Sequence, residues 1–69
     1  MGFETVVLDK VEKILGTDNL ACFVYGSLSV ICNEAEARKI YHKLSKDYGV
    51  GRVQIHKDGS YGYIFDFVA

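Results

Sequence analysis

Residues 53–67 constrain the fold most strongly, because their apolar and polar side chains alternate with the period of a β-strand. A two-residue turn at Asp58-Gly59 would mix both kinds of side chain on each face of a hairpin. A three-residue loop, Lys57-Asp58-Gly59, instead pairs Ile55 with Tyr61. It also gathers one apolar face, which consists of Val53, Ile55, Tyr61, Tyr63, Phe65 and Phe67. We therefore predict this loop, with Gly59 in the left-handed conformation.

Two further apolar runs, 20–24 and 28–32, predict an earlier hairpin around Gly26-Ser27. Glycine at the first loop position suits a type II′ turn. This turn pairs Phe23 with Val30 and Tyr25 with Leu28, and it places Phe23, Tyr25, Leu28 and Val30 in the core. The two cysteines, Cys22 and Cys32, then point to opposite faces, so we expect no disulfide between them.

Two amphipathic helices are predicted from apolar residues at three- and four-residue spacing. The first spans residues 3–15 and ends at Gly16, with a turn expected at 17–19. The second begins after Asn33, which forms a capping box with Glu36, and ends before Gly49. Its buried stripe consists of Ala37, Ile40, Tyr41, Leu44 and Tyr48.

The order helix, hairpin, helix, hairpin predicts one α+β domain over residues 1–69. We expect two layers in the order α-β-β-α-β-β, with a four-stranded antiparallel sheet and both helices on one of its faces. The Leu15-Gly16 and Tyr48-Gly49 pairs, each before a hairpin, suggest two similar αββ halves.

A chain of 69 residues buries little surface, and domains of this size usually need a disulfide, a metal or a partner subunit. Neither cysteine stands at metal-ligand spacing, and His42 and His56 are the only histidines. No nucleophile setting or phosphate loop is recognisable. We therefore expect no enzymatic activity, cofactor, metal or small-molecule ligand, and a homodimer or higher homo-oligomer. The lack of a signal peptide pattern or a long apolar run predicts a cytoplasmic protein without membrane contact.

The sheet face away from the helices is predicted to be mixed in polarity, and such a face often marks an association surface. Homodimerisation is expected through this face or through an edge strand. The candidate interface residues are Cys22, Val24, Ile31, Arg52, Gln54, His56, Ile64 and Val68.

Charge is unevenly distributed along the chain, although the net charge is only −1. Six of the eight basic residues fall within 38–57, where Asp47 is the only acid. The candidate polyanion contacts on the second helix are Arg38, Lys39, His42, Lys43 and Lys46. A solvated helix face explains the same pattern. The sheet aromatics are interpreted as core residues, because they share a face with Val53 and Ile55.

The segments Tyr48-Gly-Val-Gly-Arg-Val and Lys57-Asp-Gly-Ser-Tyr-Gly-Tyr follow an amphipathic helix, and together they resemble part of the αββ half of LAGLIDADG homing endonucleases. The resemblance covers residues 40–67. It implies nucleic-acid contact through the sheet face, by Arg52, Gln54 and His56. Residues 5–11 do not reproduce the signature helix of that family with its metal-binding acid, so the resemblance implies no catalytic residue.

The leading hypothesis is a small self-associating, non-enzymatic domain that acts through protein-protein contacts. Its short length suits a viral or mobile-element accessory protein. The alternative is a nucleic-acid-binding accessory protein that uses the basic helix at 34–48 or the polar face of the sheet.

Overall fold

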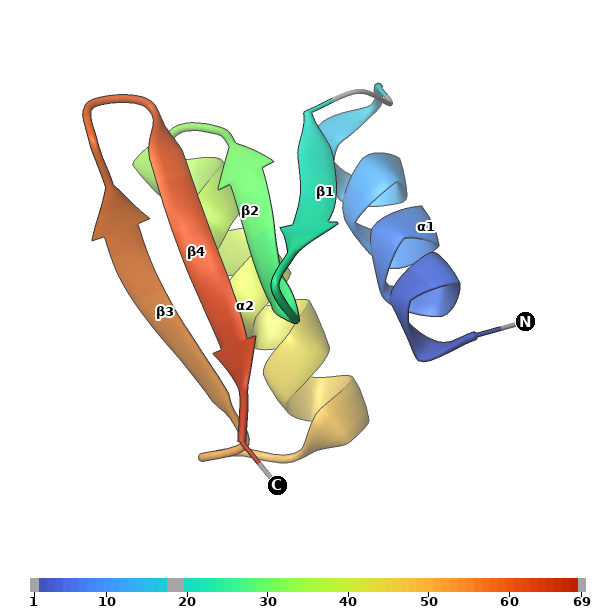
Figure 1. Ribbon diagram of the computed structural model, residues 1–69. Coiled ribbons are helices and arrows are strands. Elements are labelled where there is room, and N and C mark those ends of the chain that lie inside the picture. The colour runs from blue at the N-terminus through green and yellow to red at the C-terminus, as the bar shows by residue number, and fades with distance from the viewer. Residues whose placement is uncertain (1, 18–19, 69) are drawn as a thin grey trace.

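The computed structural model describes residues 2–17 and 20–68 and confirms the predicted α+β fold. Its elements are α1 (Phe3–Leu15), β1 (Ala21–Val24), β2 (Ser27–Ile31), α2 (Glu34–Tyr48), β3 (Val53–Asp58) and β4 (Gly62–Phe67). All strand pairs are antiparallel, and the strand order is β1-β2-β4-β3 (Figure 1). Strands β1 and β3 are therefore the edges of the sheet. Within the described ranges, neither helix has the length and hydrophobicity that a membrane span requires.

The two αββ halves are arranged alike around the centre of the sheet. In each half the helix contacts the first strand, α1 against β1 and α2 against β3, and the two helices also contact each other. The second strands, β2 and β4, pair antiparallel in the middle of the sheet. This arrangement is what a two-fold relation between the halves produces, and it places both edges at equivalent positions.

Both helices have the bounds that the sequence predicts. The Asn33 side chain accepts a hydrogen bond from the backbone N–H of Glu36 at 2.8 Å, and the Glu36 side chain accepts from the backbone N–H of Asn33 at 3.1 Å. This reciprocal capping box fixes the start of α2. Gly16 ends α1 with a φ of 76°, a value that glycine adopts without strain. The turn predicted at 17–19 lies largely outside the described residues.

One hydrophobic core lies between the helices and one face of the sheet. Val7 and Val11 of α1 meet the buried stripe of α2, in which Tyr41 and Tyr48 are only half-buried. The fully buried apolar side chains on the sheet are Leu28, Val30, Val53 and Phe65. Because residues of opposite parity face away from this core, the helices cover one side of the sheet and leave the other open.

The register predicted for the β3–β4 hairpin is wrong, although the assignment of its faces is right. Val53 pairs with Phe67 and Ile55 with Phe65, which moves the loop to residues 59–61 and leaves Tyr61 79% exposed. Ile55, predicted on the apolar face, is 36% exposed on the edge strand. A slide of two residues along each strand preserves the alternation, so side-chain pattern cannot detect it. Gly62 favours the observed register, because a Cβ there would lie 2.9 Å from the backbone oxygen of Asp58.

The β1–β2 hairpin has also moved from the predicted register. Its two loop residues are Tyr25 and Gly26, with φ values of 52° and 82°, and Phe23 pairs with Leu28. Positive φ at both loop positions is the signature of a type I′ turn rather than type II′. Tyr25, predicted in the core, is fully exposed at the turn. The type I′ turn matches the right-handed twist of the strands, and this outweighs the strain of a left-handed tyrosine.

An aromatic cluster closes the end of the core where both helices meet the sheet. The Phe67 ring contacts Phe3 edge to face, with centroids 5.0 Å apart, and contacts Tyr48 in the same way at 5.8 Å. Phe23 stacks on Phe67 at 6.4 Å. The cluster joins α1, α2, β1 and β4, and the observed β3–β4 register places Phe67 within it.

Candidate functional site

The sheet face opposite the helices, called the open face below, is the candidate site. Residues directly opposite each other form rows across it. One row runs Cys22, Ser29, Ile64, His56, and the next runs Val24, Ser27, Asp66, Gln54. A third row contains Ile31, Gly62 and Asp58. The register thus brings six of the eight predicted interface residues together on this face.

Apolar side chains occupy the β1 and β2 side of the open face. Val24 is 48% exposed and Ile31 is 56% exposed, while Ile64 is half-buried between them and β3. A shallow hollow runs beside them, lined by Val24, Tyr25, Ser27, Ser29, Asp58 and Ile64. The open face therefore presents aliphatic surface that water contacts in the single chain.

A polar cluster lies at the centre of the open face. The Ser27 hydroxyl donates to one carboxylate oxygen of Asp66, and the Nε2 atom of His56 lies 3.3 Å from the other oxygen. Asp66 is neither a lone carboxylate nor an edge-strand charge, because β4 is an inner strand and Asp66 has partners on β2 and β3.

This cluster differs from a Ser-His-Asp catalytic arrangement. A nucleophilic serine needs a base, normally histidine, in hydrogen-bond contact with its hydroxyl. Here Asp66 lies between Ser27 and His56 and uses both of its oxygens to hold them. The geometry orders three polar side chains and satisfies the carboxylate.

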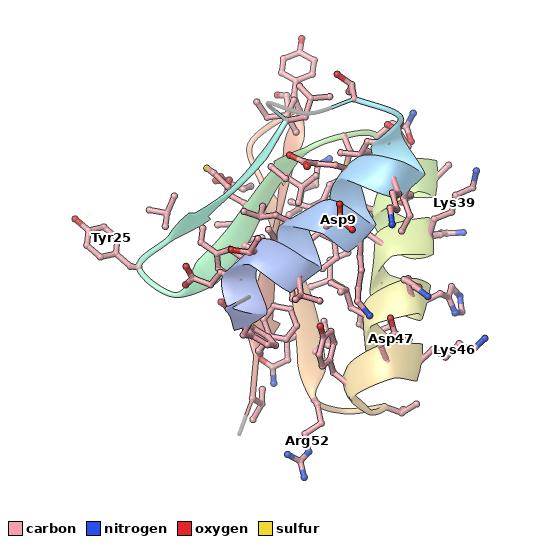
Figure 2. All side chains as sticks on the ribbon, turned by 90° about the vertical axis from the view of Figure 1, so that its right-hand side faces the viewer. Asp9, Tyr25, Lys39, Lys46, Asp47 and Arg52 are labelled. Atoms are coloured by element: carbon pink, nitrogen blue, oxygen red, sulfur yellow. The ribbon has the colours of Figure 1, made fainter. Side chains whose placement is uncertain are left out.

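The remaining two predicted interface residues lie at the end of the open face. The backbone N–H of Val68 donates to the carbonyl of Arg52 at 2.7 Å, which extends the β3–β4 pairing by one residue pair. The Arg52 side chain projects from this end of the molecule (Figure 2). Arg52 and Val68 thus border the open face.

The predicted polyanion contacts lie on another side of the protein. All five are exposed, and Lys39 and Lys46 project from α2 on the side opposite Tyr25 (Figure 2). Arg38 pairs with Glu34 at 3.5 Å, and Lys43 pairs with Asp47 at 3.4 Å. The basic residues of α2 and the open face are consequently separate surfaces.

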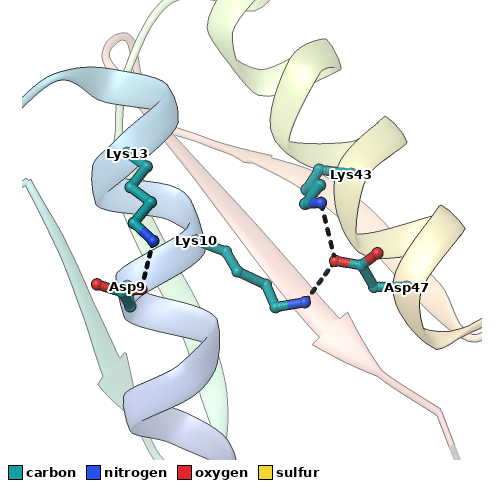
Figure 3. Close-up of polar contacts among 5 residues, drawn as sticks. All are labelled: Asp9, Lys10, Lys13, Lys43 and Asp47. Atoms are coloured by element: carbon teal, nitrogen blue, oxygen red, sulfur yellow. Dashed lines mark hydrogen bonds and ion pairs between the residues drawn. The ribbon is translucent and has the colours of Figure 1, made fainter.

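A network between the helices was missed by sequence reasoning. Lys10 of α1 donates to Asp47 of α2, which also pairs with Lys43 (Figure 3). The hydrogen bond from Lys10 is the main cause that lowers the pKa of Asp47, and the same bond raises the pKa of Lys10. The Lys10 ammonium also lies 5.2 Å from the centre of the Tyr48 ring. The available signal was Asp47 itself, the one acid in a basic segment.

The two cysteines are free thiols on opposite faces of the sheet. Cys22 is exposed on the open face, whereas Cys32 packs against the core after β2. Partial burial, with a smaller contribution from the Glu36 charge, raises the pKa of the Cys32 thiol. The described residues contain no group of three histidine, cysteine or acidic side chains placed to hold a metal ion.

No protein-family model, curated protein or solved structure matched this chain when it was compared with them.

Proposed function

We propose that this chain is a small non-enzymatic domain that self-associates and acts through protein contacts, with the open face as its contact surface. The observation that carries the proposal is the apolar surface on a face that no helix covers, where Cys22 and Ile64 lie in the row between the exposed Val24 and Ile31. Exposed apolar area of this kind is typical of association sites.

The polar centre of the open face is compatible with burial in a contact. Asp66 has a polar partner at each oxygen, Ser27 at one and His56 at the other, so the removal of water would not leave the carboxylate without polar contacts. Tyr25 adds an exposed aromatic at the rim of the hollow, and tyrosine is enriched among residues that dominate binding energy.

A second copy of the chain is the occupant that the charges of the open face favour. The two four-residue rows of the open face carry one acid, Asp66, and one basic residue, His56. In an isologous contact a residue away from the two-fold axis meets a different residue of the copy. A rotation of 180° can therefore bring acids against bases while the aliphatic side chains meet.

Sedimentation equilibrium of the purified chain at micromolar concentration tests this proposal. We expect a concentration-dependent mass above that of the monomer, and we expect Ile31→Glu to weaken association roughly tenfold or more, because it places a charge in an apolar contact. Val50→Glu is the matched control, since Val50 is 90% exposed in the loop before β3 and away from the open face. A monomer throughout the range, or equal effects of both substitutions, would contradict the proposal.

Polyanion binding by α2 is a second candidate, because Lys39 and Lys46 form no ion pair with any described residue and flank His42 on one exposed stripe. Phosphate contacts make affinity fall steeply with salt. We expect Lys39→Glu with Lys46→Glu to abolish salt-sensitive retention on heparin, with Lys13→Glu on α1 as the control. Elution of the unsubstituted chain at low salt would reject this candidate. The open face is poorly suited to the same role, because it carries Asp58 and Asp66.

A further inference from the structure

Strand β3 has backbone hydrogen-bonding groups that point out of the sheet. The Arg52 carbonyl accepts from the backbone N–H of Val68, so this carbonyl points toward β4. In an antiparallel pair this direction alternates residue by residue. The backbone groups of Val53, Ile55 and Lys57 therefore face outward along the edge.

This edge is open in the single chain. No hydrogen bond beyond the β3–β4 ladder involves the outward backbone groups of β3 among the described residues, and every β3 residue except Val53 is exposed. The pairing with β4 runs without interruption from Val53 to Asp58, so no bulge bends the strand away. Proline, another common block on edge strands, is absent from the sequence. Edge β1 is shorter.

We infer that β3 is a second self-association surface, which pairs antiparallel with β3 of another copy around a two-fold axis at Ile55. This register sets Val53 and Lys57 opposite each other and uses all the outward backbone groups. On the open face it sets Arg52 of each copy against Asp58 of the other, and Gln54 against His56. On the helix side, Ile55 meets Ile55 of the copy.

Neighbouring registers are less favourable. A slide by two residues in one direction sets Arg52 against His56 of the copy, and a slide by two residues in the other direction sets His56 against His56. Both bring together groups that carry like charge when histidine is protonated, and both shorten the overlap of the strands. Only the register centred on Ile55 places opposite charges at each end of the pairing.

The edge contact rests on the proposed self-association, and it specifies how the copies are arranged. A two-fold axis that joins two β3 strands in one continuous sheet stands perpendicular to that sheet. The axis of a contact between two open faces lies parallel to the sheet. Two isologous contacts with perpendicular axes that intersect close into a tetramer, in which two widened sheets meet through their open faces.

Charge exchange between Arg52 and Asp58 tests the edge contact. At low ionic strength we expect Arg52→Asp alone, or Asp58→Arg alone, to weaken this contact roughly tenfold or more, because each places like charges opposite each other at both ends. The combined variant should restore the association, because an acid at position 52 then lies opposite a base at position 58 of the copy. Circular dichroism confirms that each exposed-site variant remains folded.

Sedimentation of these variants separates the two contacts. We expect tetramers from the unsubstituted chain, dimers from Arg52→Asp alone and from Ile31→Glu alone, and monomers when the two are combined. The edge contact is overturned, and the open-face proposal stays intact, if Ile31→Glu abolishes association while the single charge variants have no effect. The same holds if the combined charge exchange does not restore association. Association that only the charge variants weaken overturns the open-face proposal instead. A monomer in every sample overturns both.

Discussion

Asp47 on α2 accepts a hydrogen bond from Lys10 on α1, 37 positions earlier in the chain, and this contact ties the two helices together on the side away from the sheet. Lys43 pairs with the same carboxylate from one turn away. The sequence places Lys10 and Asp47 in regions of opposite charge balance. The contact therefore joins the minority charge of each region, a base from the acidic region and the one acid of the basic region.

The Lys10–Asp47 contact predicts a pH dependence of folding. The pKa of Asp47 is lowered in the folded chain, so its contribution to stability is present above the usual carboxyl value of 3.8 and is lost as pH falls through the lower folded value. The pKa of Lys10 is raised above 10.5, so its contribution is lost as pH rises through the higher folded value.

Asp47→Asn should therefore lower the free energy of unfolding at neutral pH and leave it nearly unchanged in acid, where Asp47 is protonated. Urea titrations at several pH values measure this difference. Asp9→Asn is the control, because among the described residues Asp9 pairs only with Lys13, on the same helix at 3.2 Å with both side chains exposed. An equal effect of both substitutions at neutral pH would show that the contact between helices adds nothing.

The Asp58 backbone lies so close to Gly62 that even one added methyl group at Gly62 should destabilise the fold. A Cβ at this position would lie 2.9 Å from the Asp58 backbone oxygen, which cannot move without opening the hairpin. We expect Gly62→Ala to reduce the free energy of unfolding by about 1–3 kcal/mol, as other overpacked sites do. Gly2→Ala is the control, since no atom of the described residues, apart from its chain neighbours, lies within 4 Å of its added Cβ. Thermal melts of the two variants should differ clearly, and coincident melts would refute the steric argument.

Loss of the capping box should destabilise α2. The Asn33 side chain satisfies the Glu36 N–H, and we expect Asn33→Ala to cost about 1 kcal/mol, the usual value for a lost helix cap. Glu34→Ala is a suitable comparison, because within the described part of the chain Glu34 makes only an exposed pair with Arg38. Urea unfolding should rank Asn33→Ala as the more damaging change, and the opposite ranking would contradict the role of the cap.

Local signals predicted the helices and the sheet faces because their causes lie within a few residues. The Asn33–Glu36 capping box is complete in the sequence, and alternation separates Val53 and Phe65 from His56 and Asp66. Alternation does not change when a strand slides by two residues, so the loops were misplaced. Tyr25 and Tyr61 were then assigned to the core instead of the turns.

Contacts between distant segments had no local signal. The Ser27–Asp66–His56 cluster depends on β2 and β3 both lying beside β4, and only the order of strands in the sheet determines that. The same order turns β3 into an edge and Asp66 into an inner residue. The sequence pattern indicates the chemistry of each residue, but it does not determine which distant segments lie side by side.

Substitution of Tyr25 should affect the stability of the monomer and its self-association in opposite directions. It adopts a φ of 52° in the type I′ turn while its side chain is fully exposed, so the left-handed backbone is strained and no packing within the chain compensates. Asparagine adopts this conformation more readily and precedes glycine in the preferred type I′ sequence. We expect Tyr25→Asn to raise the free energy of unfolding of the monomer by about 0.5–1 kcal/mol.

The same substitution should weaken association through the open face, because it removes an aromatic anchor beside the hollow. Tyr61→Asn is the matched control, because Tyr61 is an exposed tyrosine in the β3–β4 loop without positive φ. This substitution should neither raise the free energy of unfolding nor weaken association through the open face. Urea unfolding at low concentration and sedimentation at high concentration measure the two effects. If Tyr25→Asn raises the free energy of unfolding and the variant still associates normally, Tyr25 is not part of the contact surface. If the substitution lowers the free energy of unfolding, the exposed ring makes stabilising contacts within the single chain.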